Sequence, residues 1–391
     1  MIRKIALGLS GLVGLLLLLA LVAYYFTMPE ALPARSESEA WLRPGPFEVG
    51  ITDLVFVDET RATSANGDAP RLANRTFPTS IWYPEGDTGQ HPLVIHSHGF
   101  ISQRTDLGYI AELLASHGYV VAAANFPLTS GTAVGGPNAN DLVNQPADLS
   151  FLIDSVLALS GNDKPFAGEV DSSRIALMGY SLGGITTSLA TYHPRLRDTR
   201  IGAAISIAGP SAGLVEKFYE SSAVPFMMIA GTLDALIDFD YNAAVIPARV
   251  RNSVLIAIEG GTHLGFGSIA EPWLRLMRHP DGLGCSAVLA NLDEDPNAAF
   301  IPLGDETDGI VLDPTIPRVC QNMSSEKALH PARQQMVTRI AVLAFFESEF
   351  GENRARREAA SHQLNTTLEA ELPEASFTSS ADSARLMLQE P

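Results

Sequence analysis

The stretch Arg174-Ile-Ala-Leu-Met-Gly-Tyr-Ser-Leu-Gly-Gly184 decides the fold of this chain. Residues 175–178 are all apolar, which is typical of a strand buried on both faces, and small residues follow Ser181 as at the start of a helix. Glycines two positions before and after Ser181 allow a turn so tight that a Cβ atom there would clash. The stretch therefore predicts a strand, a sharp turn and a helix, with Ser181 presented on the turn as a nucleophile.

Apolar runs alternate with helical patterns on both sides of this stretch. Six runs are short enough for buried parallel strands: residues 93–96, 119–124, 175–178, 203–208, 226–230 and 254–258. Residues 49–57 and 76–83 have the alternating or aromatic-rich character of edge strands, and residues 330–350 read as a final amphipathic helix. This alternation predicts an α/β fold, in which helices cover both faces of a mostly parallel central sheet at residues 48–350.

An acid and a base follow Ser181 in the chain. Asp234 comes directly after the apolar run 226–230 and Gly231, which places a carboxylate at the carboxyl edge of the sheet. Asp238 is the reserve candidate, and a carboxylate that only caps the next helix is the structural alternative. His263 lies in a glycine-rich loop after the last apolar run. The order Ser, Asp, His supplies a nucleophile, an orienting acid and a general base for acyl transfer.

Acyl transfer also needs donors that stabilise a developing oxyanion. The segment His96-Ser-His-Gly-Phe100 follows the apolar run 93–96, where the first donor loop is expected. Gly99 lets the backbone approach the site, so we expect the amide of Phe100 to act together with that of Leu182 at the start of the helix. His98 is expected to stabilise this loop.

Together these motifs resemble the platelet-activating-factor acetylhydrolase and dienelactone-hydrolase-like branch of the α/β-hydrolases, and bacterial cutinase-like polyester hydrolases are a neighbouring resemblance. The motifs that carry it are Trp82-Tyr-Pro84, Pro92-Leu-Val-Ile-His-Ser-His-Gly-Phe100, Gly179-Tyr-Ser-Leu-Gly-Gly184, Gly231-Thr-Leu-Asp234 and Gly261-Thr-His263. The resemblance covers residues 75–265. It implies a triad of Ser181, Asp234 and His263 and an oxyanion hole of Phe100 and Leu182. Dienelactone hydrolases use a cysteine nucleophile, so Ser181 argues against their substrate.

The N-terminus carries a membrane signal. Arg3 and Lys4 precede residues 5–26, an uncharged and almost wholly apolar segment of 22 residues that as a helix would span a hydrocarbon layer of roughly 30 Å. We expect residues 1–26 to form an uncleaved signal anchor with the body on the extracytoplasmic side, although Ala-Leu-Pro-Ala at 31–34 leaves cleavage and secretion open. The proline-containing residues 27–47 are expected to be an extended linker that keeps the domain clear of the bilayer.

Two late segments interrupt or end the alternating pattern. Residues 267–327 are rich in Asp, Gly and Pro and are too long for a simple connection, so they form either a cap beside the site or a surface insertion. The only two cysteines of the chain, Cys285 and Cys320, lie in this insertion and are expected to pair in an oxidising compartment, with two free buried thiols as the alternative. Residues 351–391 are expected to be a disordered tail.

The net charge limits the partners of the chain. A formal charge of −18 argues against nucleic acid, which is bound by clustered Lys and Arg. No metal or organic cofactor is implied, and the sequence indicates no oligomeric state. We therefore expect a serine carboxylic-ester hydrolase that acts on acyl or lipid-like esters. The alternatives are a thioesterase or peptidase with the same triad, and a non-catalytic protein that binds a lipid or a partner on a hydrolase scaffold.

Overall fold

The structure is a computed structural model that describes residues 14, 15, 18, 28–159, 164–292, 295 and 298–387. The expected signal anchor at residues 1–26 lies outside this part of the chain, apart from three of its residues. In the part that is described, no helix has both the length and the apolar character needed to cross a membrane.

A central sheet organises the described part of the chain. Its nine strands stand in the order β1-β2-β4-β3-β5-β6-β7-β8-β9. The pairs β1–β2, β2–β4 and β8–β9 are antiparallel, and all other neighbours are parallel. The strands are β1 (Val49–Asp58), β2 (Arg75–Pro84), β3 (Gln90–Ser97), β4 (Val120–Ala124), β5 (Glu169–Tyr180), β6 (Ile201–Ile207), β7 (Phe226–Gly231), β8 (Ser253–Ile258) and β9 (Ala375–Ser379).

The expected α/β architecture is confirmed. Each of the six short apolar runs coincides with one of the strands β3 to β8, and the two expected edge strands correspond to β1 and β2. The apolar runs are buried because the strands they form have helices on both faces. The parallel strands end at one edge of the sheet, and the loops that leave this edge carry the candidate site.

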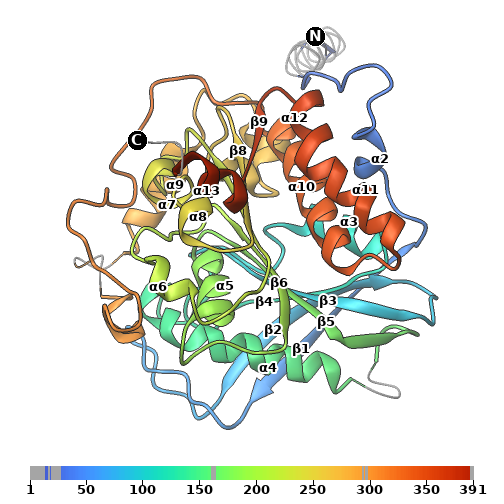
Figure 1. Ribbon diagram of the computed structural model, residues 1–391. Coiled ribbons are helices and arrows are strands. Elements are labelled where there is room, and N and C mark those ends of the chain that lie inside the picture. Colours follow the sequence, from blue (N-terminus) through green and yellow to red (C-terminus); the bar gives the residue numbers. More distant parts are fainter. Residues whose placement is uncertain are drawn as a thin grey trace, which may run out of the picture.

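Two sets of helices cover the sheet (Figure 1). On one face, α3 (Gly108–Ser116) and α10 (Pro331–Phe350) pack against side chains of β3 to β8 in one apolar cluster. On the other face lie α4 (Gln145–Leu157), α5 (Leu182–Tyr192), α6 (Glu216–Tyr219) and α8 (Ile246–Arg249). The final helix expected at residues 330–350 is α10, and it begins after His330, whose side chain caps it.

Short helical elements occupy most of the remaining connections. They are α2 (Glu39–Leu42), η1 (Ala139–Asn144), α7 (Phe239–Asn242), η3 (Leu264–Phe266), η4 (Ala270–Leu274), α9 (Asp281–Leu289) and η5 (Ile301–Leu303). The elements η4, α9 and η5 lie within residues 267–327. This insertion therefore has some secondary structure of its own, although most of it remains loop.

The expectation of a disordered tail at residues 351–391 is wrong for the described residues up to 387. They form α11 (Arg354–His362), η6 (Gln363–Thr367), α12 (Leu368–Glu371), β9 and α13 (Ser380–Met387). β9 pairs with β8 over five residues and extends the sheet. A buried stripe at every fourth residue anchors this region in the core: Ala360, Leu364, Leu368 and Leu372. The high content of charged and small residues concealed this stripe in the sequence.

The described part of the expected linker, residues 28–47, is not a free spacer. The Glu371 carboxylate accepts hydrogen bonds from Ser36 Oγ and from the amide of Ser38. Trp41 on α2 is 8% exposed, and the Arg356 guanidinium lies over its ring at 4.7 Å from the centroid. The polar side chains of this segment are partners of the C-terminal helices. The segment therefore holds the chain on the body of the domain from Met28 onward.

Candidate active site

Ser181 stands on a strained turn between β5 and α5. Its backbone has φ 55° and ψ −120°, a conformation that L-residues rarely adopt, and its amide donates to Ile207 O at 2.8 Å. A Cβ atom on Gly179 would lie 1.9 Å from the carbonyl oxygen of Gly183, and one on Gly183 would lie 2.0 Å from that of Ser97. The glycines are therefore required by close backbone approaches around Ser181.

His263 and Asp234 form a buried hydrogen-bonded pair. Asp234 lies in the loop after β7, His263 lies in the loop after β8, and His263 Nδ1 is 2.7 Å from Asp234 Oδ2. The other oxygen of Asp234 accepts from the amides of Leu236 and Ile237 at 2.9 and 2.8 Å. The carboxylate accepts a hydrogen bond from the Nδ1–H group, so the imidazole keeps Nε2 as its basic nitrogen.

The electrostatic surroundings make His263 a stronger base. Burial alone lowers the pKa of the imidazole, but the carboxylates of Asp234 and Asp281 outweigh this effect and raise the pKa above its ordinary value of 6.5. For Asp234, burial raises the pKa of the carboxyl group, and contact with His263 offsets this only in part. The Tyr180 hydroxyl donates to His263 O at 2.9 Å and fixes the backbone of the histidine loop.

Asp281 is a functional candidate that sequence reasoning missed. This carboxylate, at the start of α9 in the insertion, is fully buried. It accepts three backbone hydrogen bonds, from Ala235 at 2.9 Å, from His263 at 2.9 Å and from Leu264 at 2.8 Å. Asp281 therefore ties the loop of the acid to the loop of the base. No local motif marks it, because its partners are backbone groups distant in sequence.

The loop before Phe100 is held rigidly beside Ser181. His98 Nδ1 lies 2.7 Å from Gly99 O, and His98 Nε2 accepts the amide of Phe126 at 3.1 Å. Burial lowers the pKa of His98, so this histidine is neutral and structural, as expected. Asp106 accepts from the amide of Gly99 at 3.1 Å. A Cβ atom on Gly99 would come within 3.2 Å of Ser181 Cβ, which shows how closely the loop approaches the serine.

Two backbone donors and two side-chain groups of the site have no hydrogen-bond partner within the described part of the protein. Within the described residues, the amides of Phe100 and Leu182 donate to no protein acceptor. Ser181 Oγ and His263 Nε2 likewise have no protein partner there. The arrangement places a serine hydroxyl, an imidazole and two backbone N–H groups on loops at one edge of the sheet, and these are the kinds of group that acyl transfer requires.

The reserve acid Asp238 has another task. It caps α7 by accepting from the amides of Asp240 and Tyr241, and it accepts from Asn322 Nδ2 at 2.7 Å. Asp238 therefore caps a helix, whereas Asp234 is the carboxylate that contacts His263. In the described residues, no group of three or more His, Cys, Asp or Glu side chains could hold a metal ion.

The insertion contributes directly to the surroundings of the site. Cys285 and Cys320 form the expected disulfide. The amide of Cys320 donates to Leu236 O at 3.3 Å, two residues after Asp234. The disulfide therefore joins α9, which carries Asp281, to a segment that contacts the acid loop. This part of the insertion therefore packs against the loop that carries Asp234.

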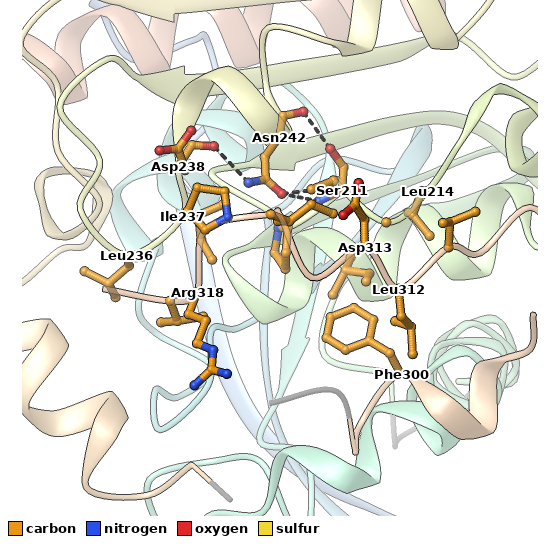
Figure 2. A pocket seen from close by; sticks show the side chains of 18 residues that line it. Ser211, Leu214, Leu236, Ile237, Asp238, Asn242, Phe300, Leu312, Asp313 and Arg318 are labelled. Carbon is orange, nitrogen blue, oxygen red and sulfur yellow. Dashed lines mark hydrogen bonds between the residues drawn. The ribbon is translucent and has the colours of Figure 1, made fainter. Parts of the chain in front are cut away.

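An apolar pocket is lined in part by Leu236 and Ile237, which follow Asp234 in the chain (Figure 2). Its volume is about 140 Å³. Its lining includes Ile185, one helical turn after Ser181, and Leu236 and Ile237, just after Asp234. The insertion supplies Phe300, Leu312, Arg318 and neighbouring residues to the same lining. The pocket therefore exists only because the insertion folds against the loops after β6 and β7.

Most polar groups at this pocket already have partners within the protein. Asn242 Oδ1 accepts from the amides of Ser211 and Ala212 at 2.7 and 2.9 Å. Asn242 Nδ2 donates to Asp238 O at 2.8 Å, and the Ser211 hydroxyl donates to Asn242 O (Figure 2). These bonds leave mainly apolar side chains to meet a ligand, which suits an acyl chain or a ring.

Comparisons with known proteins place the chain among ester hydrolases. The model of the family described as "PETase: PET hydrolase-like" matches residues 73–267, which include the Ser181 turn, Asp234 and His263. Cutinase 2 of Thermobifida cellulosilytica is 26% identical over 249 residues, covering 60% of this chain and 80% of the relative. Cutinase cut1 of Thermobifida fusca is also 26% identical, covering 60% of this chain and 66% of the relative.

The fold has a counterpart among solved structures. A ferulic acid esterase from Streptomyces cinnamoneus superposes with a TM-score of 0.50 at 20% identity, covering 80% of this chain and 95% of that one. At this identity the likeness concerns the fold alone. The chain belongs to the α/β-hydrolase superfamily. Within that superfamily it is an ester-hydrolysing enzyme similar to the PET hydrolase-like family and the cutinases.

Proposed function

We propose that this enzyme is a serine carboxylic-ester hydrolase that works through an acyl-enzyme. The observation that carries the proposal is the buried hydrogen bond of 2.7 Å between Asp234 and His263 at the same sheet edge as the strained Ser181 turn. Such a pair orients an imidazole and raises its basicity, which is the arrangement that activates a serine hydroxyl.

The reaction follows from these groups. His263 Nε2 takes the proton of Ser181 as Oγ attacks the ester carbonyl carbon, and the carbonyl oxygen becomes negative. The free amides of Phe100 and Leu182 are the donors for this oxyanion. His263 then gives its proton to the departing alcohol, which leaves an acyl group on Ser181. Water, deprotonated by His263, releases the acid, and Asp234 keeps the imidazole oriented throughout.

The substrate class is an ester with an apolar part of limited size. The pocket beside Ile185 and Leu236 is lined mainly by apolar side chains, and its volume of about 140 Å³ suits a short acyl chain or a single ring. The family match and the cutinase relatives support esters as the bond class. Acyl or lipid-like esters remain the substrates that we propose.

The proposed location is the extracytoplasmic face of the cytoplasmic membrane. Residues 5–26 are apolar enough and long enough to serve as an anchor, and Arg3 and Lys4 favour a cytoplasmic N-terminus. The Cys285–Cys320 disulfide suits an oxidising compartment. Cleavage near residues 31–34 would instead release the body as a secreted enzyme.

The first experiment is covalent labelling with a fluorophosphonate probe, followed by turnover of short-chain nitrophenyl esters. We expect the full chain in detergent to label and to hydrolyse esters, and Ser181→Ala to lose both. Ser155→Ala, at an α4 serine that only donates to Phe151 O, is the matched control and should keep both activities. If the folded wild type neither labels nor turns over any ester, the non-catalytic binding alternative replaces this proposal.

A substrate panel then separates the remaining chemistries of the same triad. Esters, thioesters and amides with the same acyl group are compared at equal concentration. We expect kcat/KM to be highest for the ester. A preference for the thioester or the amide would identify the thioesterase or peptidase alternative, while the labelling result would still establish Ser181 as the nucleophile.

A further inference from the structure

An exposed apolar surface follows the histidine loop. It consists of Ile269, Trp273, Leu276 and Met277, which are 61%, 78%, 69% and 37% exposed, and we call it the Trp273 surface. On the inner side of the same segment, Ala270 is fully buried and Leu274 is 8% exposed. The segment is therefore anchored to the body by buried apolar side chains and presents other large apolar side chains to the outside. A group of large side chains exposed in this way marks an interaction surface.

The segment before this surface is held firmly to the domain. The amide of Ser268 donates to Asp106 O at 2.7 Å, and the Gln335 amide group donates to Gly267 O at 3.0 Å. Phe266 is fully buried, with its ring 6.4 Å from that of Tyr180. The Trp273 surface thus begins only a few residues after His263 on a segment with fixed attachments, and whatever contacts it lies close to the candidate site.

The N-terminal chain enters the domain beside the same surface. Met28 and Glu30 line a hollow of about 290 Å³ together with Leu274, Arg275 and Met277. The carbonyl oxygen of Glu30 accepts from Arg333 Nη1 at 3.1 Å, which fixes the entry point on α10. Because the linker is docked from Met28 onward, it provides no long spacer between the domain and the preceding residues.

This entry point sets the distance to a bilayer. The apolar run ends at Phe26, two residues before Met28, and two residues reach at most about 7 Å. If residues 5–26 span the membrane, the hollow at Met28 and the adjoining Trp273 surface lie at the level of the lipid headgroups. Tryptophan is the residue that favours this level, where an apolar ring and a polar N–H both find suitable surroundings.

Basic side chains border the surface and suit the same environment. Arg278 and Lys327 are exposed, and Lys327 lines the hollow at Met28. Lys and Arg at the edge of an apolar face contact lipid phosphates while the apolar side chains enter the acyl boundary. Glu30 and Glu374 line the same hollow, and the Glu374 carboxylate is paired with Arg333, so Arg278 and Lys327 are the basic side chains at this border that are exposed.

We infer that the Trp273 surface docks on the lipid bilayer beside the N-terminal anchor and holds the candidate site next to the membrane. This inference rests on the proposed function, because the proposed anchor at residues 5–26 sets the position of the bilayer. It goes further in assigning a second membrane contact, built from described residues, to the segment that follows His263. Docking at this second point fixes the orientation of the domain relative to the bilayer.

The tryptophans provide a selective test. Of the three in the chain, Trp41 and Trp82 are 8% and 3% exposed, and only Trp273 is open. The full chain is reconstituted in phosphatidylcholine vesicles with or without bromine on the acyl chains, because bromine quenches tryptophan only at short range. We expect brominated lipid to quench the Trp273 emission, taken as the difference between wild type and Trp273→Phe. Aqueous acrylamide should quench this component only weakly.

A matched control uses another exposed apolar position. Ile51 on β1 is 54% exposed, at the opposite end of the strand order from β9. Figure 1 shows β1 at the lower side of the molecule, away from the upper side where α2 and α12 lie. Ile51→Trp in the Trp273→Phe background should be quenched by acrylamide and not by brominated lipid. Unchanged turnover of a soluble ester by each variant shows that the fold is intact.

Other results overturn the inference. Trp273 emission that acrylamide quenches and brominated lipid does not would place this surface in water. Emission shielded from both quenchers would mean that a second copy or another segment of the chain covers it. Alkaline carbonate extraction of the same vesicles tests the anchor separately. A chain that carbonate extracts refutes the proposed anchor, whereas lipid quenching of Trp273 would still establish the docking surface.

Discussion

Replacement of Asp281 by asparagine tests how the insertion supports the candidate site. The carboxylate accepts two amides at Oδ2, from Ala235 and His263, and one at Oδ1, from Leu264. An asparagine side chain has a single acceptor oxygen, and its NH₂ group must replace the other. Whichever way the amide is turned, at least one buried backbone N–H then faces a donor and loses its partner.

The magnitude follows from the bonds that are lost. A hydrogen bond to a charged group contributes about 1.5 to 3 kcal/mol, and a buried unsatisfied donor adds its own desolvation cost. We therefore expect Asp281→Asn to lower the free energy of unfolding by about 2 to 3 kcal/mol. Because displacement of a catalytic group by about 1 Å costs up to roughly a hundredfold in rate, kcat/KM should fall about 10- to 100-fold.

A pH profile separates this role from a general loss of stability. The negative charge of Asp281 is one of the causes that raise the pKa of His263. Its removal should lower that pKa and move the acid limb of kcat/KM toward lower pH than in the wild type. Stability is measured by urea unfolding, and kcat/KM is measured on a soluble nitrophenyl ester between pH 5 and 9.

The matched control is Asp305→Asn in the same insertion. Asp305 is exposed, and its carboxylate accepts only from the amide and hydroxyl of Thr307. Its replacement should leave the activity and the pH profile unchanged. If Asp281→Asn keeps wild-type kcat/KM and the same acid limb, Asp281 does not position the loops of Asp234 and His263, and the reasoning is refuted.

Three further predictions concern the base, the disulfide and the turn. Since a raised pKa means that the His263 imidazole stays protonated to higher pH, kcat/KM should fall as the pH drops through an apparent pKa above 6.5, and an acid limb below 6.5 would contradict this. Replacement of both Cys285 and Cys320 by serine opens a loop with a sequence separation of 35. It should lower the free energy of unfolding, measured in urea, by up to about 4 kcal/mol. An unchanged urea midpoint would show that the disulfide does not stabilise the insertion. Gly183→Ala would place its Cβ 2.0 Å from the carbonyl oxygen of Ser97 and should destabilise the protein by more than about 3 kcal/mol. The fold is measured by circular dichroism, and Ser181 is measured by probe labelling. A variant that is folded and fully labelled would show that the turn is not constrained.

Much of the candidate site could be predicted from local patterns. A buried parallel strand leaves an uninterrupted apolar run, and a tight turn leaves small residues at fixed offsets, as around Ser181. Asp234 and His263 each follow such a run, and parallel strands end at one edge of the sheet. Chain order and strand ends were therefore sufficient to propose the pair that the structure brings to 2.7 Å.

The terminal regions could not be predicted in the same way. Residues 354–387 have few apolar side chains, and the stripe from Ala360 to Leu372 is buried only because α10 and β8 are already in place to receive it. Likewise, polar Ser36 and Ser38 resemble linker residues until Glu371 is brought to them from the far end of the chain. Composition records the polarity of such residues but not their partners.

The sequence by itself determined the α/β architecture, the order of the site residues and the expectation of an N-terminal anchor, because each depends on periodicity or spacing within a short stretch. Only the tertiary structure decided that Asp281 ties the two site loops together, that residues 300–319 complete an apolar pocket, and that Trp273 is exposed beside the entry of the chain. The physical reason is that these features depend on backbone amides and surfaces that meet across long sequence separations, where one residue carries no local sign of its partner.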